Sequence, residues 1–143
     1  MVDFLYEPLA SFGEDDTEYE LLTEDFVAVE KLRGEDLLVV DPAGLTFLAE
    51  RAMHDASFYL RESHNAMVAA ILSDPEASEN DRYVARAMLE NAVVSAEGRL
   101  PLCQDTGTAT IVAKKGARVY TGGGDEEALT RGVFNTYTTD SLR

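Results

Sequence analysis

A chain of 143 residues with 45% hydrophobic and 27% charged residues has the material for one domain with a hydrophobic core, and too little length for two. The formal net charge of −15 repels phosphate backbones and anionic lipid, which argues against nucleic-acid and membrane partners, and no apolar run is long enough to cross a bilayer. The amino terminus has neither the basic start nor the apolar stretch of a signal peptide, so a cytoplasmic protein is the expectation.

The acidic charge is concentrated at the amino terminus. Residues 1–36 carry a net charge of −10, whereas the remaining 107 residues carry −5. Residues 1–18 mix apolar and acidic side chains without a clean period, and we expect them to form an extended acidic arm. We interpret the acidic side chains as a solvated surface, and we expect residues 19–143 to form part of one domain.

The first elements expected are a hairpin and a helix. Two β-prone runs between residues 19 and 41 flank a turn that contains Gly34, which predicts a β-hairpin. Asp41 and Pro42 then indicate a helix, because aspartate is a favoured N-cap and proline fits the first helical turn. Apolar residues recur at helical spacing as far as Tyr59, so one face of this helix is expected to be buried.

Two further helices are expected to follow. One begins near Ser63 and is ended by Pro75, because the residue before a proline avoids helical angles. The other begins after Ser78, which forms a possible capping box with Asp81, and Gly98 provides its stop signal. The spacing of apolar residues on both helices is typical of core-facing surfaces.

The last third of the chain returns to strand-like sequence. Residues 108–113 and 118–121 are β-prone runs on either side of a Lys-Lys-Gly turn, which predicts a short two-stranded ribbon. Three glycines lead into a final helix that starts at Asp125 and whose apolar side would comprise Leu129, Val133 and Tyr137. The predicted fold class is therefore α+β and helix-rich, with an amino-terminal hairpin, three helices, a ribbon and a final helix.

The segment Leu-Pro-Leu-Cys-Gln-Asp-Thr-Gly, residues 100–107, lies between a helix that must end and a strand that must begin. Functional side chains are common on loops that rigid elements hold at both ends. The thiolate of Cys103 can ligate a soft metal or a cluster, and Gln104 and Asp105 offer an amide and a carboxylate to a polar substrate. A single cysteine excludes an internal disulfide, and by itself it is more often a small buried side chain than a ligand.

Two other features carry a weaker signal. The glycines 122–124 precede a helix and could bind an anion, but Asp125 and its acidic neighbours occupy that turn, so a structural turn is favoured. His54 and His64 are interpreted as polar contacts in the core or at the surface. His64 lies beside Asn65 and is the more interesting of the two.

Several segments together resemble class I, iron–sulfur-dependent fumarate hydratases. They are the loop around Cys103, residues 114–126 with Gly-Gly-Gly-Asp-Glu, residues 131–143 with Tyr-Thr-Thr-Asp-Ser-Leu-Arg, and upstream residues 54–58 and 74–81. The resemblance extends from about residue 19 to the last residue and identifies an amino-terminal portion. The Cys-Gln-Asp-Thr-Gly core is shared with tartrate dehydratases and mesaconases, which stay open as alternatives.

The resemblance implies a hydro-lyase that interconverts (S)-malate and fumarate with a [4Fe–4S] cluster held by three cysteines. The iron without a protein ligand acts as a Lewis acid toward the leaving hydroxyl. Cys103 matches the first cluster cysteine, while Gln104 and Asp105 match positions that meet the substrate. Asp105 is also a candidate acid/base, and Arg143 matches an arginine that clamps a substrate carboxylate. The family further implies a small dicarboxylate substrate and a homodimer.

The chain departs from the family pattern in what it lacks. Two further cluster cysteines, additional cationic contacts and a threonine base lie farther along the longer chains of the family, so we expect a fragment whose partner is the remainder of the parent enzyme. One thiolate cannot hold a cubane cluster, and the chain alone is expected to be inactive. Apolar surface left uncovered would promote self-association. The alternative from another class is a stand-alone, non-catalytic binding module.

Overall fold

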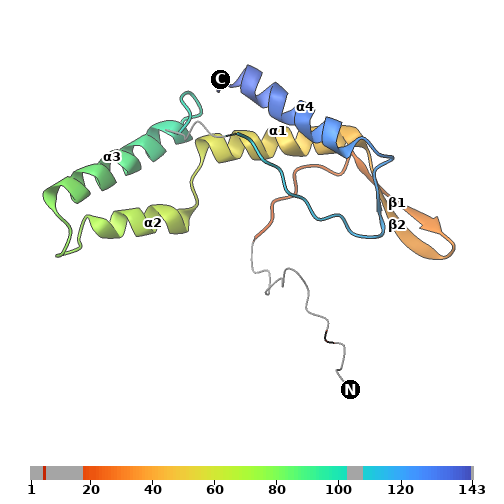
Figure 1. The fold of residues 1–143 in the computed structure, drawn as a ribbon, viewed down its shortest axis with the longest axis horizontal. Helices are drawn as coiled ribbons and strands as arrows, with labels where there is room; N and C mark the ends of the chain where they lie inside the picture. Colours follow the sequence, from red (N-terminus) through yellow and green to blue (C-terminus); the bar gives the residue numbers. More distant parts are fainter. Residues whose placement is uncertain (1–4, 6–17, 103–107, 143) are drawn as a thin grey trace.

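The structure is a computed structural model, and it describes residue 5, residues 18–102 and residues 108–142. Its elements in chain order are β1 (Val27–Leu32), β2 (Glu35–Val40), α1 (Pro42–Phe58), α2 (Glu62–Ile71), α3 (Glu79–Ala96), β3 (Val119–Tyr120) and α4 (Asp125–Thr139). Helix α1 lies at the centre, α4 runs along it, and the α2–α3 pair extends away from its carboxyl-terminal end (Figure 1). The predicted helix-rich α+β class is confirmed. The predicted acidic arm, residues 1–18, lies outside the description except for residues 5 and 18.

The amino-terminal hairpin forms as expected. Strands β1 and β2 are antiparallel, in a register that pairs Val27 with Val40 and Leu32 with Glu35. The two residues between them, Arg33 and Gly34, have φ angles of 53° and 89°. Two successive positive φ angles define the type I′ turn, whose twist matches that of the strands it joins.

Local capping signals explain where the helices begin and end. The Asp41 carboxylate accepts a hydrogen bond of 2.8 Å from the amide of Ala43 at the start of α1. Ser78 and Asp81 form the predicted capping box, with each side chain bonded to the backbone amide of the other residue. Gly98 follows α3 with a φ of 73°, as a helix stop requires.

The predicted ribbon between residues 108–113 and 118–121 is wrong in its pairing. Residues 108–113 are not part of a strand, and β3 instead pairs in parallel with β2, placing Leu38 opposite Val119. The three-stranded sheet therefore has the order β1-β2-β3. A parallel pair needs a long crossover, and the segment containing α1, α2 and α3 provides it.

Helices α1 and α4 pack unusually closely because small residues line their contact. The buried residues of α4 are Ala128, Gly132 and Thr136, rather than the larger predicted set of Leu129, Val133 and Tyr137, which are only half-buried. A methyl group added at Gly132 would lie 2.5 Å from the Thr46 carbonyl oxygen and 2.6 Å from the Ala49 side chain. The larger apolar residues cannot occupy a contact at which one backbone touches the other.

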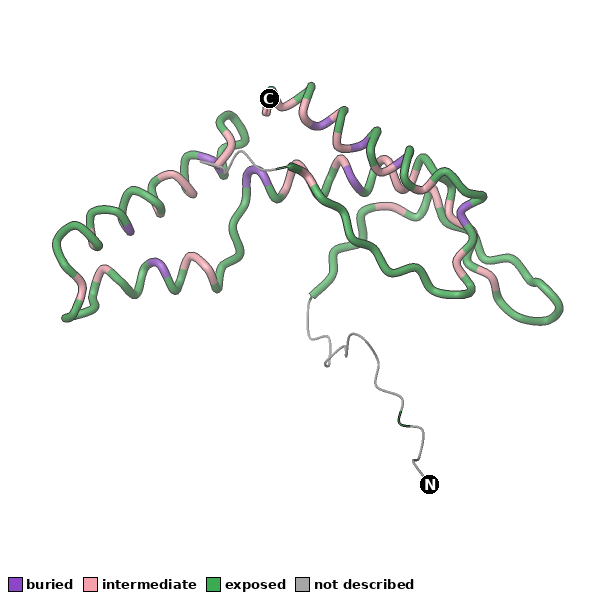
Figure 2. Tube along the Cα trace, in the orientation of Figure 1, coloured by how far each residue is buried: buried purple, intermediate pink, exposed green. Residues whose placement is uncertain are grey.

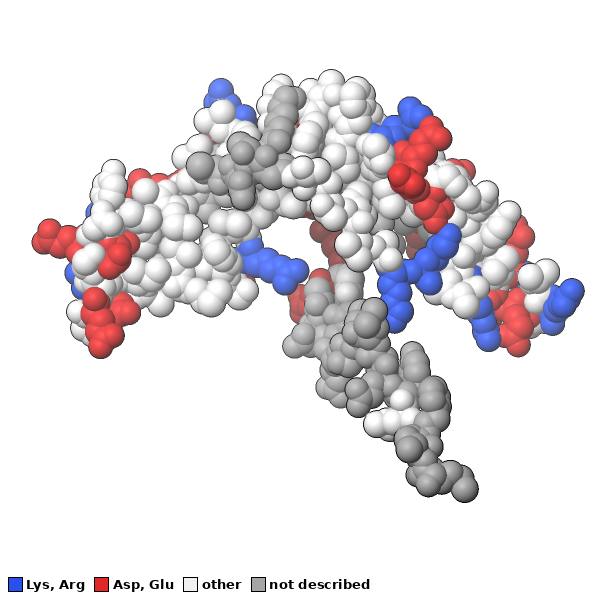
Figure 3. Space-filling model, viewed as in Figure 1, with Lys and Arg blue, Asp and Glu red and all other residues white. Residues whose placement is uncertain are grey.

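The α2–α3 pair is much less covered. Among its apolar side chains Val68 and Ala85 are buried, whereas Met67, Tyr83 and Val93 are 66–73% exposed. Figure 2 shows this pair as mainly exposed and intermediate, with buried positions concentrated where α1 meets its neighbours. On the face drawn in Figure 3, acidic side chains gather at the far end of the pair and basic ones point into the hollow beside it. No helix in the described ranges combines the length and apolar character that a membrane span requires.

Candidate functional site at the carboxyl-terminal end of α1

The four residues predicted to carry the chemistry lie outside the described residues. Cys103, Gln104 and Asp105 fall within 103–107, and Arg143 is the last residue of the chain. Their immediate neighbours in the sequence, Leu102 and Leu142, are described. The contacts made by these neighbours and by the elements behind them define the surroundings that the described chain offers.

The last turn of α1 anchors the residue that precedes Cys103. The amide of Leu102 donates a hydrogen bond of 2.8 Å to the carbonyl oxygen of Ser57. Ser57 is 3% exposed, and its hydroxyl donates a 2.7 Å bond to the carbonyl of Met53 within the same helix. Leu102, the residue before Cys103, is therefore attached to a buried turn of α1.

The same turn also holds the end of α3. The hydroxyl of Ser95 donates a hydrogen bond of 2.8 Å to the carbonyl oxygen of Phe58, and Ser95 is completely buried. The Phe58 ring is 3% exposed and lies 4.7 Å, centroid to centroid, from the imidazole of His54. The hydrogen bond between Ser95 and Phe58 holds the end of α3 against the end of α1.

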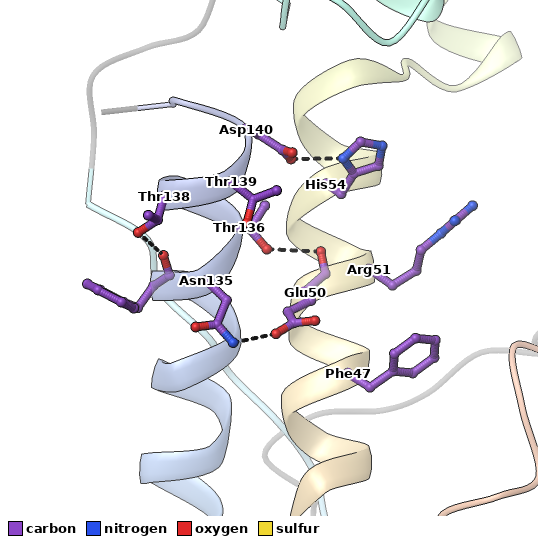
Figure 4. Close-up of a pocket in the computed structure, with 10 residues that line it drawn as sticks. Phe47, Glu50, Arg51, His54, Asn135, Thr136, Thr138, Thr139 and Asp140 are labelled. Atoms are coloured by element: carbon purple, nitrogen blue, oxygen red, sulfur yellow. Dashed lines mark hydrogen bonds and ion pairs between the residues drawn. The ribbon is translucent and has the colours of Figure 1, made fainter.

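A hydrogen bond between two side chains attaches the end of α4 to the same region. Nδ1 of His54 lies 2.8 Å from a carboxylate oxygen of Asp140, and the two residues are 86 positions apart in the sequence (Figure 4). An ionised carboxylate can only accept hydrogen bonds, so Nδ1 of His54 must be the donor. The Asp140 side chain is 15% exposed, so solvent competes weakly for this contact.

Further polar contacts run along the α1–α4 interface toward its amino-terminal half. The Asn135 amide donates a 2.5 Å bond to the Glu50 carboxylate, and the Thr136 hydroxyl donates to the Glu50 carbonyl at 3.2 Å. Figure 4 shows these side chains between the two helices, along a groove that His54 and Asp140 close at one end. The Thr46 hydroxyl donates to the carbonyl of Ala128 at 2.9 Å.

Helix α4 ends in a tight turn just before residue 143. The amide of Leu142 donates to the carbonyl of Tyr137 at 3.1 Å, and the amide of Asp140 donates to the carbonyl of Thr136 at 2.8 Å. Ser141 has a φ of 53°. A left-handed residue followed by a bond reaching back five positions is the Schellman turn, in which glycine is the usual residue. Serine holds this conformation at a steric cost.

The amino-terminal end of α4 is occupied by its own acidic residue. The Asp125 carboxylate pairs with the Lys115 ammonium at 2.6 Å and with the hydroxyl of Thr121. The hydrogen bonds from Lys115 and then Thr121 lower the pKa of the Asp125 carboxyl below its usual value of 3.8. This carboxylate occupies the turn that an external anion would approach, which supports the structural interpretation of the three glycines.

The two histidines have different surroundings. His64 and Asn65 are half-buried and line an apolar groove between α2 and α3 that also reaches Leu102. The sequence analysis treated His54 as an ordinary polar contact and missed its place where the end of α1 meets the end of α4. The available signal was its position in the His-Asp-Ala-Ser-Phe segment, residues 54–58, all of which lie at the end of α1.

The sequence contains one cysteine. In residues 18–102 and 108–142, no group of three or more histidine, cysteine, aspartate or glutamate side chains is arranged to hold a metal ion. The single thiol of the sequence is Cys103. Its chemistry suits an iron–sulfur cluster, but one thiolate supplies only one of the ligands that a cubane needs.

Comparisons with known proteins agree on one family. The family described as Fumarate hydratase (Fumerase) matches residues 46–143. The chain is 59% identical over 140 residues to the anaerobic class I fumarate hydratase of Escherichia coli strain K12, and 58% identical to the aerobic class I enzyme of that strain, each match covering 98% of this chain. It is 42% identical to fumarate hydratase 1, mitochondrial, of Leishmania major, over its whole length. The chain spans about a quarter of the length of these relatives. The chain therefore belongs to the fumarate hydratase family and corresponds to an amino-terminal portion of its class I members.

Proposed function

We propose that this chain is the amino-terminal portion of a hydro-lyase that interconverts (S)-malate and fumarate. The identity of 57–59% to class I fumarate hydratases of enteric bacteria supports this reaction class. The proposal includes Cys103 as one of three cysteine ligands of a [4Fe–4S] cluster, and Gln104, Asp105 and Arg143 as substrate contacts. It extends to the remainder of a longer chain as partner and to a homodimer.

One observation carries the proposal beyond the comparisons. The carboxyl-terminal turns of α1 bind both the residue before Cys103 and a residue three positions before Arg143, through Ser57 and His54. A ligand loop and a substrate-binding arginine that act on one small molecule must be held near each other. The described contacts attach the two segments to a single helix end, as that requirement demands.

The chemistry assigned to this chain is binding, orientation and proton transfer. The guanidinium of Arg143 forms two parallel hydrogen bonds with one carboxylate of the dicarboxylic substrate, which fixes its orientation. The amide of Gln104 donates to a substrate oxygen. In dehydration Asp105 delivers a proton to the departing hydroxyl as the carbon–oxygen bond breaks, and a base supplied by the rest of the longer chain takes the proton from the neighbouring carbon. In hydration Asp105 removes a proton from the attacking water.

The cluster contributes one kind of chemistry to the proposed reaction. When bound, it supplies a Lewis-acidic iron that stabilises the negative charge developing on the leaving hydroxyl. The thiolate of Cys103 fits one ligand position, and the rest of the donor set must come from outside these 143 residues. The chain alone is therefore proposed to be inactive, and anaerobic reconstitution of the isolated chain should give no stable iron–sulfur absorption.

The decisive experiment uses the full-length enzyme that contains this chain. A Cys103→Ala variant should lose its iron–sulfur absorption and at least about 1,000-fold of its malate dehydration rate, because a metal Lewis acid contributes several kcal/mol to such a step. The matched control is Ser73→Ala, which removes an exposed hydroxyl just after α2 and should leave both readouts unchanged. A Cys103→Ala enzyme that keeps both cluster and turnover would overturn the proposal.

Substrate choice is tested on the same preparation. Assays with malate, tartrate and methyl-branched dicarboxylates should give the highest kcat/KM for malate. Preference for tartrate or a methyl-branched acid would assign the chain to one of the related dehydratases. Absence of turnover with all of them would favour the binding module.

A further inference from the structure

We infer that His54 and Asp140, together with the left-handed turn at Ser141, form a positioning device for Arg143. The inference rests on the proposed function, in which Arg143 binds a substrate carboxylate. Neither His54 nor Asp140 is assigned a contact with substrate. Their role is to fix the backbone from which Arg143 departs, so they are positioning residues and not catalytic ones.

The first support is the way the end of α4 is attached. Asp140 is the C-cap residue of α4, the point at which a helix otherwise frays. Its carboxylate is held at 2.8 Å by His54, which belongs to another helix and is itself packed against the buried ring of Phe58. A charge-assisted bond to a packed partner restrains the cap more strongly than a solvated side chain would.

The second support is the conformation of Ser141. A φ of 53° is strained for serine, and such strain persists only where surrounding contacts over-determine the backbone. The bond from the Leu142 amide to the Tyr137 carbonyl is one such contact, and the His54–Asp140 pair is the second. Glycine would adopt this φ without strain, whereas serine adopts it at a steric cost that the two contacts offset.

The third support is the shared attachment. Ser57, one turn beyond His54 in α1, accepts the hydrogen bond from Leu102. The carboxyl-terminal end of α1 therefore holds both the residue before Cys103 and a residue shortly before Arg143 in place. A shift of the α4 end relative to α1 would change the spacing between these two segments without unfolding either helix.

The expected consequence is a loss of substrate affinity. A bidentate pair between guanidinium and carboxylate depends on the angle of approach, so loosening the backbone behind the arginine weakens binding more than it slows the chemical step. In steady-state terms the Michaelis constant rises while the turnover number changes little.

The experiment compares variants of the full-length enzyme. His54→Ala and Asp140→Ala should each raise KM for malate by roughly 10- to 100-fold, with kcat reduced less than about threefold and iron content unchanged. The double variant should resemble either single one, because both remove the same contact. His54→Asn keeps a donor near the position of Nδ1 and should restore KM to within about threefold of the wild-type value.

A second variant does not depend on removing a packed side chain. Ser141→Gly relieves the strained φ, so the melting temperature should stay the same or rise, while KM for malate should rise because glycine leaves the exit direction free. The matched control is Arg131→Ala, which breaks an exposed ion pair with Glu127 on the same helix and should leave kcat and KM unchanged.

The outcomes separate this inference from the proposed function. Arg143→Lys should raise KM by itself, and if it does not, the assigned role of Arg143 fails and the inference fails with it. If Arg143→Lys raises KM but the His54, Asp140 and Ser141 variants leave it unchanged, the inference alone is overturned. It is also overturned if those variants lower kcat and iron content together, since that pattern indicates a general structural role.

Discussion

The two helical pairs of this protein are held together in different ways. Helices α1 and α4 are in backbone contact through Gly132 and are joined by hydrogen bonds along their length. Helices α2 and α3 are adjacent in sequence and meet through few buried side chains, of which Val68 and Ala85 are the apolar ones. The first pair buries its contact surface by itself, whereas the second leaves much of its apolar surface in water.

The difference indicates what each pair needs. The closely packed pair holds two residues that flank the candidate site, since Leu102 and Asp140 are both attached to the carboxyl-terminal end of α1. A helix pair with an open apolar groove gains stability only when another surface covers it. The relatives extend over about four times the length of this chain.

The largest expected effect comes from disturbing the closer pair. Gly132→Ala should reduce the free energy of unfolding by about 3 kcal/mol, because the new methyl group would overlap the Thr46 carbonyl and the Ala49 side chain. Urea titration followed by far-ultraviolet circular dichroism measures the change. Gly116→Ala, whose added methyl group would lie 3.6 Å from Val119, should stay within about 0.5 kcal/mol of the wild type. Equal effects at both positions would show that the close contact is not essential.

A smaller effect is expected on the open pair. In the 143-residue chain, the double variant Val84→Lys/Met88→Lys should lower the binding of a hydrophobic dye and weaken self-association by roughly tenfold, because two side chains of the apolar groove become charged. Dye fluorescence and sedimentation measure the two quantities. Val112→Lys, on a residue that is 93% exposed outside the helices, is the control. An identical response to Val112→Lys would mean that the groove between α2 and α3 is not the surface that binds the dye and drives self-association.

The smallest expected effect is a loss of stability at acid pH. One carboxylate at the start of α3 and one at the start of α4 contribute to it. The pKa of Asp81 is lowered by its hydrogen bonds to Ser78, and the pKa of Asp125 by those to Lys115 and Thr121. A carboxyl whose pKa is lower in the folded chain stabilises the fold fully above its usual value of 3.8 and loses that contribution as pH falls through the folded value. Asp81→Asn should flatten this dependence for the α3 amide protons, and Asp125→Asn for those of α4, in hydrogen-exchange measurements. A dependence that survives both variants would have another origin.

The parts of the fold that were predictable are those encoded by neighbouring residues. Asp41 with Pro42, Ser78 with Asp81, and the glycine after Arg33 each act within a few positions, and each fixed a helix start or a turn as expected. The pairing of β3 with β2 could not be predicted in this way. It joins residues about 80 positions apart. Local sequence patterns do not show whether residues 118–121 pair with β2 or with the neighbouring residues 108–113.

The buried face of α4 was mispredicted for a related reason. Hydrophobic periodicity selects large apolar residues, but Gly132 and Thr136 are buried because they are small and because a neighbouring backbone accepts the threonine hydroxyl. The His54–Asp140 contact was likewise invisible, since nothing local connects two residues on separate helices. The candidate site residues came from resemblance of the motifs, and the structure adds the helix end to which their neighbours are attached.

The arrangement of α1 and α4 has a consequence for how the protein is made. Sixty-six residues separate the end of α1 from the start of α4. At about 5–20 residues per second, a ribosome needs about 3–13 s to synthesise that interval. During this time α1 emerges with its contact face unpaired, and the α2–α3 pair, with its open groove, appears before the partner of α1 exists. The contacts that hold α4 against α1 can therefore form only after the α2–α3 pair has been synthesised.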